Sequence, residues 1–142
     1  MRAHISSAAN RALALLYGLR EETAEGGALR ALLRAMGIEA REITVPELSQ
    51  TVGALAGLGG KTAKPFEGDA PDGAMLVFCG FSQGQLNGLL EAMRVAKVQV
   101  AYKAVLTAHN QKWSAAALLE ELKQEHAAME RQSDVDGRRN GQ

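Results

Sequence analysis

The chain has 142 residues, and 16 basic side chains balance 16 acidic ones, so its formal net charge at pH 7 is zero. With no net positive charge and only 4% aromatic residues, the composition disfavours nucleic-acid binding, which depends on cations and stacking rings. Hydrophobic residues make up 46% of the chain, enough for one domain with a sizeable core. No stretch approaches the roughly 20 apolar residues of a membrane span. We therefore expect a protein that binds neither nucleic acid nor a membrane.

Cys79 is the only cysteine. A thiol without an intrachain partner fits a reducing compartment better than an oxidising one. The apolar run at residues 12–17 superficially resembles a signal peptide, but Gly18 and a helical pattern follow it directly, which favours a strand. The sequence therefore predicts a cytoplasmic protein.

The first half of the chain, residues 11–60, has the pattern strand, helix, strand, helix. Residues 13–17 form a short, continuously apolar run, typical of a strand covered on both faces. Residues 38–45 are half polar and predict a second strand at the edge of the sheet, and Pro46 then begins a short helix. The helix between these two strands has a regularly spaced apolar face. That face consists of Leu29, Leu32, Leu33 and Met36.

The second half, residues 74–130, repeats this pattern more clearly. Residues 75–78 are the most hydrophobic stretch and predict a central strand. Ser82, with a glutamine three residues later, predicts a capping box at the start of a helix. A fourth strand is expected at residues 98–106, and Ser114 is the expected N-cap of a last, long helix.

These patterns predict a single α/β domain at residues 11–130, made of two β-α-β-α repeats joined by a long loop at residues 61–73. Residues 1–10 are expected to be a flexible N-terminus and residues 131–142 a disordered tail.

The alternation of strands and helices predicts a four-stranded, mostly parallel sheet in the order 2-1-3-4, with helices on both faces. A thioredoxin-like or other α/β arrangement is also compatible with the pattern. In the favoured order, the turns at Gly18 and Gly80 would lie side by side at the carboxyl edge, where open α/β sheets bind ligands.

The densest polar and aromatic cluster of the sequence is residues 107–114. Its structural interpretation is that Asn110 turns the chain while Trp113 packs against the following helix, but His109 is more than a turn requires. We name as candidate ligand-binding residues Gly18, Gly80, Phe81, Ser82, Lys103, Thr107, His109, Asn110 and Trp113.

Catalysis is a weaker hypothesis. Cys79 and His109 both follow the ends of neighbouring strands, where a thiolate and an imidazole base could meet. A free cysteine is more often a small buried hydrophobic residue, and no acidic residue is placed to orient the histidine. The three histidines, with His4 and His126, lack the spacing of metal ligands. We therefore expect neither a metal nor a cofactor.

Three segments together resemble a known family. They are Met75-Leu-Val-Phe-Cys-Gly-Phe, Lys103-Ala-Val-Leu-Thr-Ala-His-Asn-Gln-Lys-Trp-Ser and Leu119-Glu-Glu-Leu-Lys-Gln-Glu-His. They are similar to the bacterial family known as domain of unknown function 3783, and the resemblance extends over about residues 12–130. The matching residues include Gly80, Phe81, Lys103, Thr107, His109, Asn110 and Trp113. The resemblance implies no activity or ligand, and the family usually has a small residue at the position of Cys79, which argues against a nucleophile there.

Three hypotheses follow. The first is a non-catalytic binding or regulatory domain that holds a small polar ligand or a protein partner at the carboxyl edge of the sheet. The second is an enzyme that uses His109 as an acid or base. The third is a structural protein that self-associates as a homodimer through its second strand.

Overall fold

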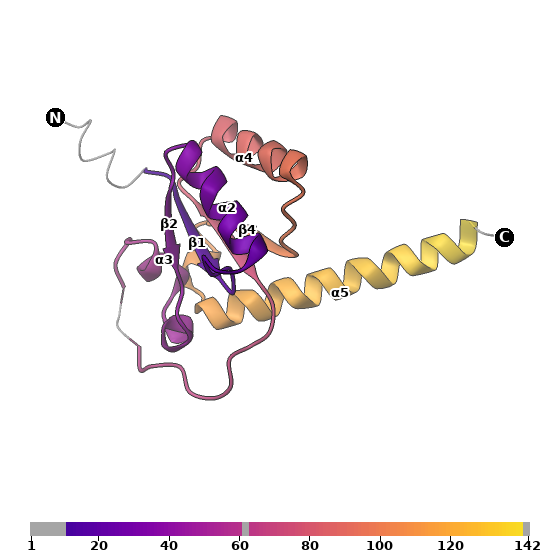
Figure 1. Ribbon diagram of the computed structural model, residues 1–142. Helices are drawn as coiled ribbons and strands as arrows, with labels where there is room; N and C mark the ends of the chain where they lie inside the picture. The colour runs from indigo at the N-terminus through magenta and orange to yellow at the C-terminus, as the bar shows by residue number, and fades with distance from the viewer. Residues whose placement is uncertain (1–10, 61–62, 141–142) are drawn as a thin grey trace.

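The computed structural model describes residues 11–60 and 63–140, with side chains up to residue 132. It contains a four-stranded sheet in the order β2-β1-β3-β4 (Figure 1). The strands are β1 (Leu13–Tyr17), β2 (Glu39–Glu42), β3 (Met75–Cys79) and β4 (Tyr102–Val105). The predicted α/β class and strand order are confirmed, including the place of the half-polar second strand at an edge. The predicted flexible segment, residues 1–10, lies outside the described residues, as do residues 61–62 of the connecting loop.

The two outer strand pairs, β1 with β2 and β3 with β4, are parallel, so the sheet is mostly parallel as predicted. The central pair, β1 with β3, is antiparallel. Leu13 lies opposite Cys79, and Tyr17 lies opposite Met75. The pattern inside each half fixes only the direction of its own two strands, because a crossover helix returns the chain to run parallel. The long connection between the halves leaves their relative direction open.

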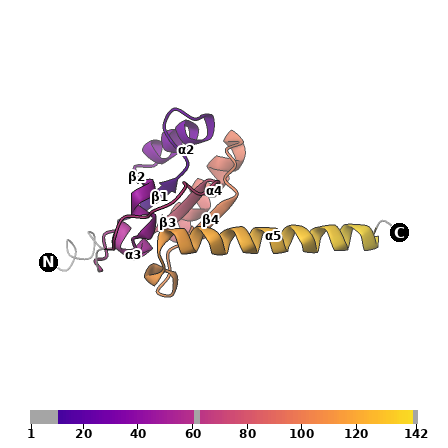
Figure 2. The same cartoon turned by 90° about the horizontal axis from the view of Figure 1, so that it is seen from below.

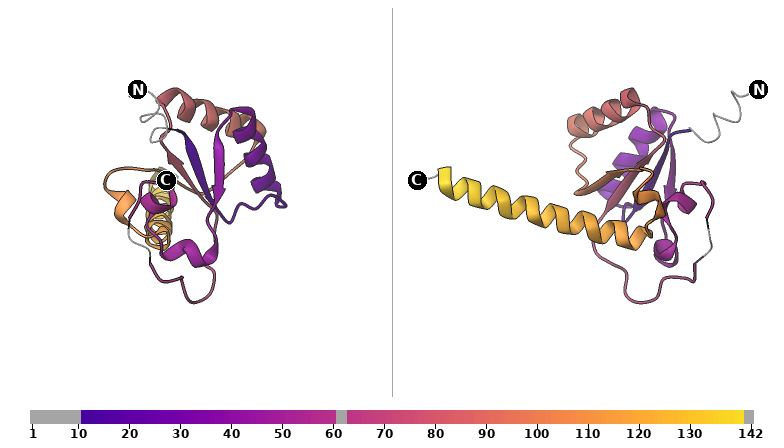
Figure 3. Two further views of the ribbon diagram at one scale, coloured as in Figure 1. Left: turned by 90° about the vertical axis from the view of Figure 1, so that its left-hand side faces the viewer. Right: turned by 180° about the vertical axis from the view of Figure 1, so that it is seen from behind.

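Helices cover both faces of the sheet (Figure 3). On one face lie α2 (Ala24–Ala35) and α4 (Gln83–Ala96). On the other lie the 3-10 helix η1 (Val45–Ser49), the short α3 (Val52–Leu55) and the start of α5 (Ala115–Asn140), which follows the 3-10 helix η2 (Asn110–Lys112).

Each face of the sheet has its own buried core. The core under α2 and α4 includes Leu16, Leu29, Leu33, Leu76, Phe78 and Leu89. The core under η1, α3 and α5 includes Leu15, Leu48, Val52, Val77, Cys79 and Leu119. Because successive residues of a strand point to opposite faces, Leu15 and Leu16 belong to different cores. The sheet is therefore covered on both sides along its central strands.

The predicted helix caps at Ser82 and Ser114 are both present. Ser82 and Gln85 form a reciprocal capping box at the start of α4. The Ser114 hydroxyl accepts a hydrogen bond of 3.1 Å from the backbone N–H of Ala117. These bonds satisfy donors that would otherwise lack a partner in the first turn of each helix.

Four elements differ from the predicted bounds by more than one residue. β2 ends at Glu42 rather than at residue 45. β4 begins at Tyr102 rather than at residue 98. The helix expected from Pro46 is divided into η1 and α3, because Gln50 between them has an extended backbone. α5 continues to Asn140, where a disordered tail was expected from Arg131.

The length of α5 has a simple local reason. Residues 131–140 contain no proline and only one glycine, so no strong helix breaker interrupts them. The helix extends well beyond the sheet (Figure 2). Its distal part is polar, and among the described residues no helix is both long and apolar enough to cross a membrane.

Candidate functional site

The antiparallel central pair separates the two turns that the sequence analysis placed side by side. Gly18 follows β1 and lies against Gly73, at the amino end of β3: a Cβ on Gly18 would be 2.5 Å from the Gly73 carbonyl oxygen. Gly80 follows β3 and lies at the opposite edge of the sheet. The expectation of a site shared by Gly18 and Gly80 is therefore wrong. Gly80 shares its edge with the segment that follows β4, because β3 and β4 run parallel.

The loop from Thr107 to Trp113, here called the histidine loop, is closed by a reciprocal pair of hydrogen bonds. The backbone N–H of Thr107 donates to Oδ1 of Asn110 at 2.8 Å, and the backbone N–H of Asn110 donates to Oγ1 of Thr107 at 3.0 Å. Nδ2 of Asn110 also donates to the carbonyl oxygen of Val105 at 3.0 Å. The polar groups of both side chains are thus used to fold the loop. Asn110 has the turn-forming role that the structural interpretation gave it, and Thr107 has a structural role that was not predicted.

The histidine loop is also fixed to the first half of the chain. The backbone N–H of Val52 donates to the carbonyl oxygen of Trp113 at 2.8 Å, and that of Ala115 donates to Gln50 at 2.9 Å. Thr51 and Ser114 form an antiparallel bridge between these bonds. Trp113 itself is half-buried at the margin of the core under α5. The loop therefore presents its exposed side chains from a fixed backbone.

His109 is the exposed aromatic side chain of this loop. Its ring lies edge-on to the Trp113 ring, with centroids 5.0 Å apart and an interplanar angle of 74°. Edge-to-face ring contacts of this kind add roughly 0.5–1.5 kcal/mol beyond burial. Among the described residues, this ring contact is the only interaction of the His109 side chain. Its two ring nitrogens are therefore available to a partner.

The three residues after β3 serve the turn into α4. Gly80 has a left-handed backbone with φ of 69°, a conformation that favours glycine. Phe81 lies edge-on to Phe78, with ring centroids 5.3 Å apart. Ser82 caps α4. Each residue has a complete structural explanation.

Cys79 is a core residue in this fold. It is 4% exposed, and its neighbours belong to the core under α5. Burial raises the pKa of its thiol to about 12, so the group is protonated at neutral pH. A cysteine nucleophile acts as the thiolate. The geometry therefore gives no support to a Cys79 nucleophile. Among the described residues, no three His, Cys, Asp or Glu side chains gather in a way that could hold a metal ion.

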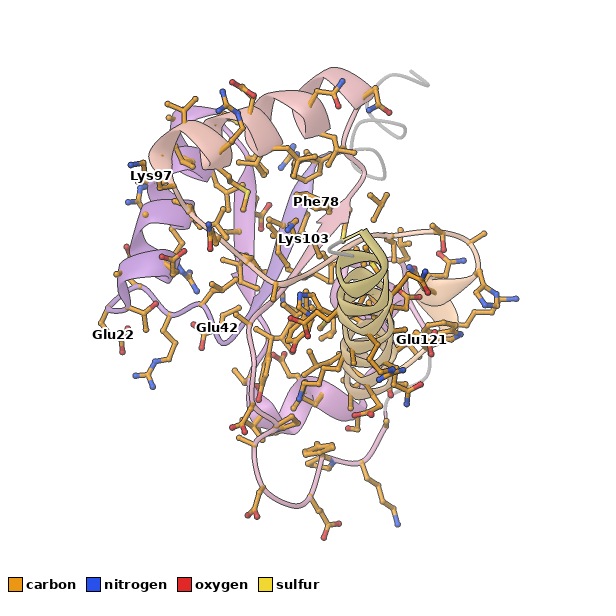
Figure 4. All side chains as sticks on the ribbon, turned by 90° about the vertical axis from the view of Figure 1, so that its right-hand side faces the viewer. Glu22, Glu42, Phe78, Lys97, Lys103 and Glu121 are labelled. Carbon is orange, nitrogen blue, oxygen red and sulfur yellow. The ribbon has the colours of Figure 1, made fainter. Side chains whose placement is uncertain are left out.

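Lys103 lies away from the histidine loop, near the start of β4 (Figure 4). It lines a groove of about 670 Å³ between α4, the segment before β4 and α5. His126 of α5 lines the same groove, with its ring edge-on to Tyr102 at a centroid distance of 5.6 Å. The sequence analysis missed this groove, because its residues come from three separate elements and include an exposed side of α4. The basic residues Arg94, Lys103 and His126 on an apolar background were the available signal.

The second strand also bears on the hypothesis of self-association. β2 has the sequence Glu-Ala-Arg-Glu, so three of its four side chains are charged. Nη2 of Arg30 in α2 is 3.2 Å from Oε1 of Glu42. Charged side chains on a short edge strand oppose pairing with another strand. The edge of β2 is therefore poorly suited to a homodimer contact.

The fold and the positions of these residues define an α/β domain built from two β-α-β units, whose second unit carries both the histidine loop and the groove. Residues 74–129 match the family model of the domain of unknown function DUF3783. The match begins just before β3 and ends within α5, and the first half of the chain lies outside it. No curated protein and no solved structure match the chain.

Proposed function

We propose that this protein is a non-catalytic binding or regulatory domain of the bacterial cytoplasm, and that the histidine loop at the carboxyl edge of β3 and β4 contacts its ligand or protein partner. The observation that carries the proposal is the exposure of the His109 side chain and the absence of a hydrogen-bond partner for it among the described residues. Its imidazole is exposed and held against Trp113, whereas the polar groups of Thr107 and Asn110 are used inside the loop. An imidazole can both donate and accept hydrogen bonds, which suits a polar small molecule or a peptide.

The burial of Cys79 supports the non-catalytic part of the proposal, because burial raises the pKa of its thiol to about 12 and so disfavours the thiolate that a nucleophile requires. The free state of this one cysteine supports the cytoplasmic location. The fixed backbone of the loop supports recognition, since preorganised groups lose little entropy on binding.

The test is thermal unfolding of the protein against a panel of nucleotides, cofactors, small metabolites and short peptides. A ligand at 100 times its dissociation constant adds about 2.7 kcal/mol to the free energy of unfolding. For a domain of this size, the melting temperature should rise by roughly 5 °C.

His109→Phe is the informative variant. It keeps a ring that can contact Trp113 and removes both ring nitrogens, so it should keep the melting temperature of the free protein and lose the ligand-induced shift. Asn110→Ala is the contrasting variant, because it removes the hydrogen bonds that close the loop and should lower the melting temperature itself. A ligand whose shift is unchanged in His109→Phe would show that the histidine loop is not the recognition site.

A further inference from the structure

The groove at the amino end of β4 has an apolar floor that is continuous with the core. Met93, Val98 and Val100 line it and are 3–6% exposed, as members of the core under α2 and α4. The exposed side chain of Leu90 adds an apolar side to the groove, and Ala101, the residue before β4, also lines it. A ligand with an apolar body would therefore meet hydrocarbon on several sides, and burying that surface would be favourable.

The charged residues that line the groove, Arg94 and Lys103, are both basic, and the imidazole of His126 lies in the same lining. Among the described residues, no acidic side chain lines the groove. Two of these side chains have carboxylate partners outside the lining: Nε of Arg94 is 3.1 Å from Glu91, and Nδ1 of His126 is 3.6 Å from Glu130.

Lys103 differs from the other two basic residues. Its ammonium group donates a hydrogen bond of 2.7 Å to the carbonyl oxygen of Val100, which also lines the groove. This partner is neutral, and among the described residues no carboxylate forms an ion pair with Lys103. An ammonium group has three donors, so two remain after this bond. The groove thus combines an apolar floor with one cation whose charge is not neutralised.

We propose that this groove binds a small amphipathic anion. The apolar body of the ligand packs against Leu90, Met93 and Val98, and its carboxylate or phosphate group pairs with the ammonium of Lys103. The groove volume of about 670 Å³ falls within the range of small-molecule sites, roughly 300–1,000 Å³. All of its lining residues fall within the segment that matches the domain family. The site is separate from the histidine loop, which follows the other end of β4.

The test is calorimetric titration with four probes that separate the body of the ligand from its head group. Octanoate and octyl phosphate carry an apolar chain and an anion, octanol carries the chain alone, and acetate carries the anion alone. Octanoate or octyl phosphate should bind more tightly than octanol and acetate. The one of these two anions with the lower dissociation constant shows whether the groove prefers a carboxylate or a phosphate head group. Amide chemical shifts recorded during the titration should change in residues 90–103 and around His126.

Variants then assign the contacts. Lys103→Gln should weaken binding of the preferred anion about tenfold, the usual effect of losing a charge-assisted hydrogen bond, and should leave octanol unaffected. Leu90→Gln and Ala101→Phe should weaken the anion and octanol together, because they alter the apolar surface. Lys64→Gln, at an exposed lysine outside the groove, should bind like the wild type.

Two results would overturn the proposal: no binding of either amphipathic anion, or unchanged affinity in Lys103→Gln. His109→Phe separates this site from the proposed function. It should bind octanoate or octyl phosphate normally even where it has lost the partner of the histidine loop.

Discussion

The two halves of the molecule have the same order of strands and helix but differ in the segments that follow their second strands, β2 and β4. β1-α2-β2 and β3-α4-β4 are both β-α-β units with parallel strands. The glycines that follow their first strands, Gly18 and Gly80, have nearly identical φ angles of 71° and 69°. Because β1 and β3 pair antiparallel at the centre of the sheet, the arrangement is the one that a two-fold rotation between the halves would produce. Equivalent turns therefore lie at opposite edges of the sheet.

The segments that follow the two edge strands are closely comparable. In the first half, the backbone N–H of Thr44 donates to Oε1 of Glu47 at 2.9 Å. In the second half, that of Thr107 donates to Oδ1 of Asn110 at 2.8 Å. In each case the threonine precedes a short 3-10 helix and bonds to the side chain three residues later; Thr44 is the N-cap of η1, whereas η2 has His109 as its N-cap.

This comparison separates scaffold from candidate function. In both halves, the backbone N–H of a threonine donates to the side chain three residues later, and we call each such pair a threonine box. Because the threonine box occurs in both halves, we assign it a structural role in the fold. The residue before the partner differs: Pro46 in the first half and His109 in the second. Pro46 fixes the start of a 3-10 helix, whereas His109 exposes an imidazole. The comparison thus makes His109 the distinctive residue of the second loop.

The largest expected effect tests whether the two halves unfold together. Leu16 of β1 and Leu76 of β3 are fully buried partners across the central pair. Leu16→Ala and Leu76→Ala should each lower the free energy of unfolding by about 2–5 kcal/mol. Because these two residues are neighbours, the double variant should deviate from additivity by roughly 0.5–3 kcal/mol.

The measurement is chemical denaturation of the two single variants and the double variant. Leu48→Ala serves as the control, since Leu48 belongs to the core on the other face of the sheet and its effect should add to that of Leu76→Ala. All variants should unfold in one transition. Two separate transitions would show that each half is stable alone.

The next effect concerns the turn at Gly18, compared with a second left-handed glycine of the first half, Gly37. Gly18 and Gly37 share a φ of 71°, but a Cβ on Gly37 would meet nothing within 4 Å, whereas one on Gly18 would lie 2.5 Å from the Gly73 carbonyl oxygen. Gly37→Ala should cost about 1–2 kcal/mol, the strain of a left-handed backbone. Gly18→Ala should cost clearly more, because a backbone atom of the connecting loop, the carbonyl oxygen of Gly73, must move. Equal losses in thermal unfolding would contradict the close contact between Gly18 and this loop.

The two boxes should also differ in their response to acid. Burial raises the pKa of Glu47, but hydrogen bonds from the backbone and side chain of Thr44 and the nearby charge of Arg41 outweigh it, so the net pKa lies below the usual 4.5. A lowered pKa in the folded state means that the carboxylate stabilises the fold above the pKa of the unfolded chain. This contribution is lost as the pH falls from about 4.5 through the lower pKa of the folded state. Asn110 does not titrate in this range.

The measurement is the free energy of unfolding between pH 7 and pH 3 for the wild type and Glu47→Gln. Glu47→Gln should be less stable at pH 7, because it loses the charge-assisted bond of 2.9 Å from Arg41. The difference from the wild type should shrink as the pH falls. Asn110→Ala, by contrast, should differ from the wild type by the same amount at every pH, and a pH-dependent difference in that variant would contradict the comparison of the two boxes.

The order of the sheet and the caps of its helices could be predicted from the sequence, because both depend on local patterns. The continuous apolar runs of β1 and β3 identify the central strands, and Ser82 with Gln85 identifies the start of α4. The antiparallel direction of β3 relative to β1 depends on the connection between the halves, which has no periodic pattern. The predicted location of Gly18, beside Gly80, assumed that β1 and β3 run in the same direction. That prediction was therefore wrong.

Only part of the candidate site could be predicted from the sequence, as was the case for the fold. His109 could be named as a candidate from the sequence because it lies in a polar and aromatic cluster after a predicted strand, and its role in binding stays a prediction. The structural role of Asn110 could be predicted only as one of two alternatives, and that of Thr107 was not predicted, since the spacing of a threonine and an asparagine does not reveal whether they bond to each other. The groove around Lys103 could not be predicted, because α4, β4 and α5 meet there only in the folded chain.

The smallest expected effect compares the glycines of the two equivalent helices. Gly88 lies inside α4, and a Cβ there would make an ordinary contact of 3.5 Å with Cε of Met36. Alanine in a helix interior is more stable than glycine by roughly 0.5–1 kcal/mol, so Gly88→Ala should raise the free energy of unfolding by about that amount.

Gly26 of α2 is the opposite case, because a Cβ there would lie 2.1 Å from the carbonyl oxygen of Arg20. Gly26→Ala should therefore destabilise the protein in the same denaturation experiment. A stabilising Gly26→Ala, or a destabilising Gly88→Ala, would show that the two helices are not packed as described. The difference in sign arises because the chain before α2 folds back against the first turn of that helix, whereas the exposed side of α4 has room for one more methyl group.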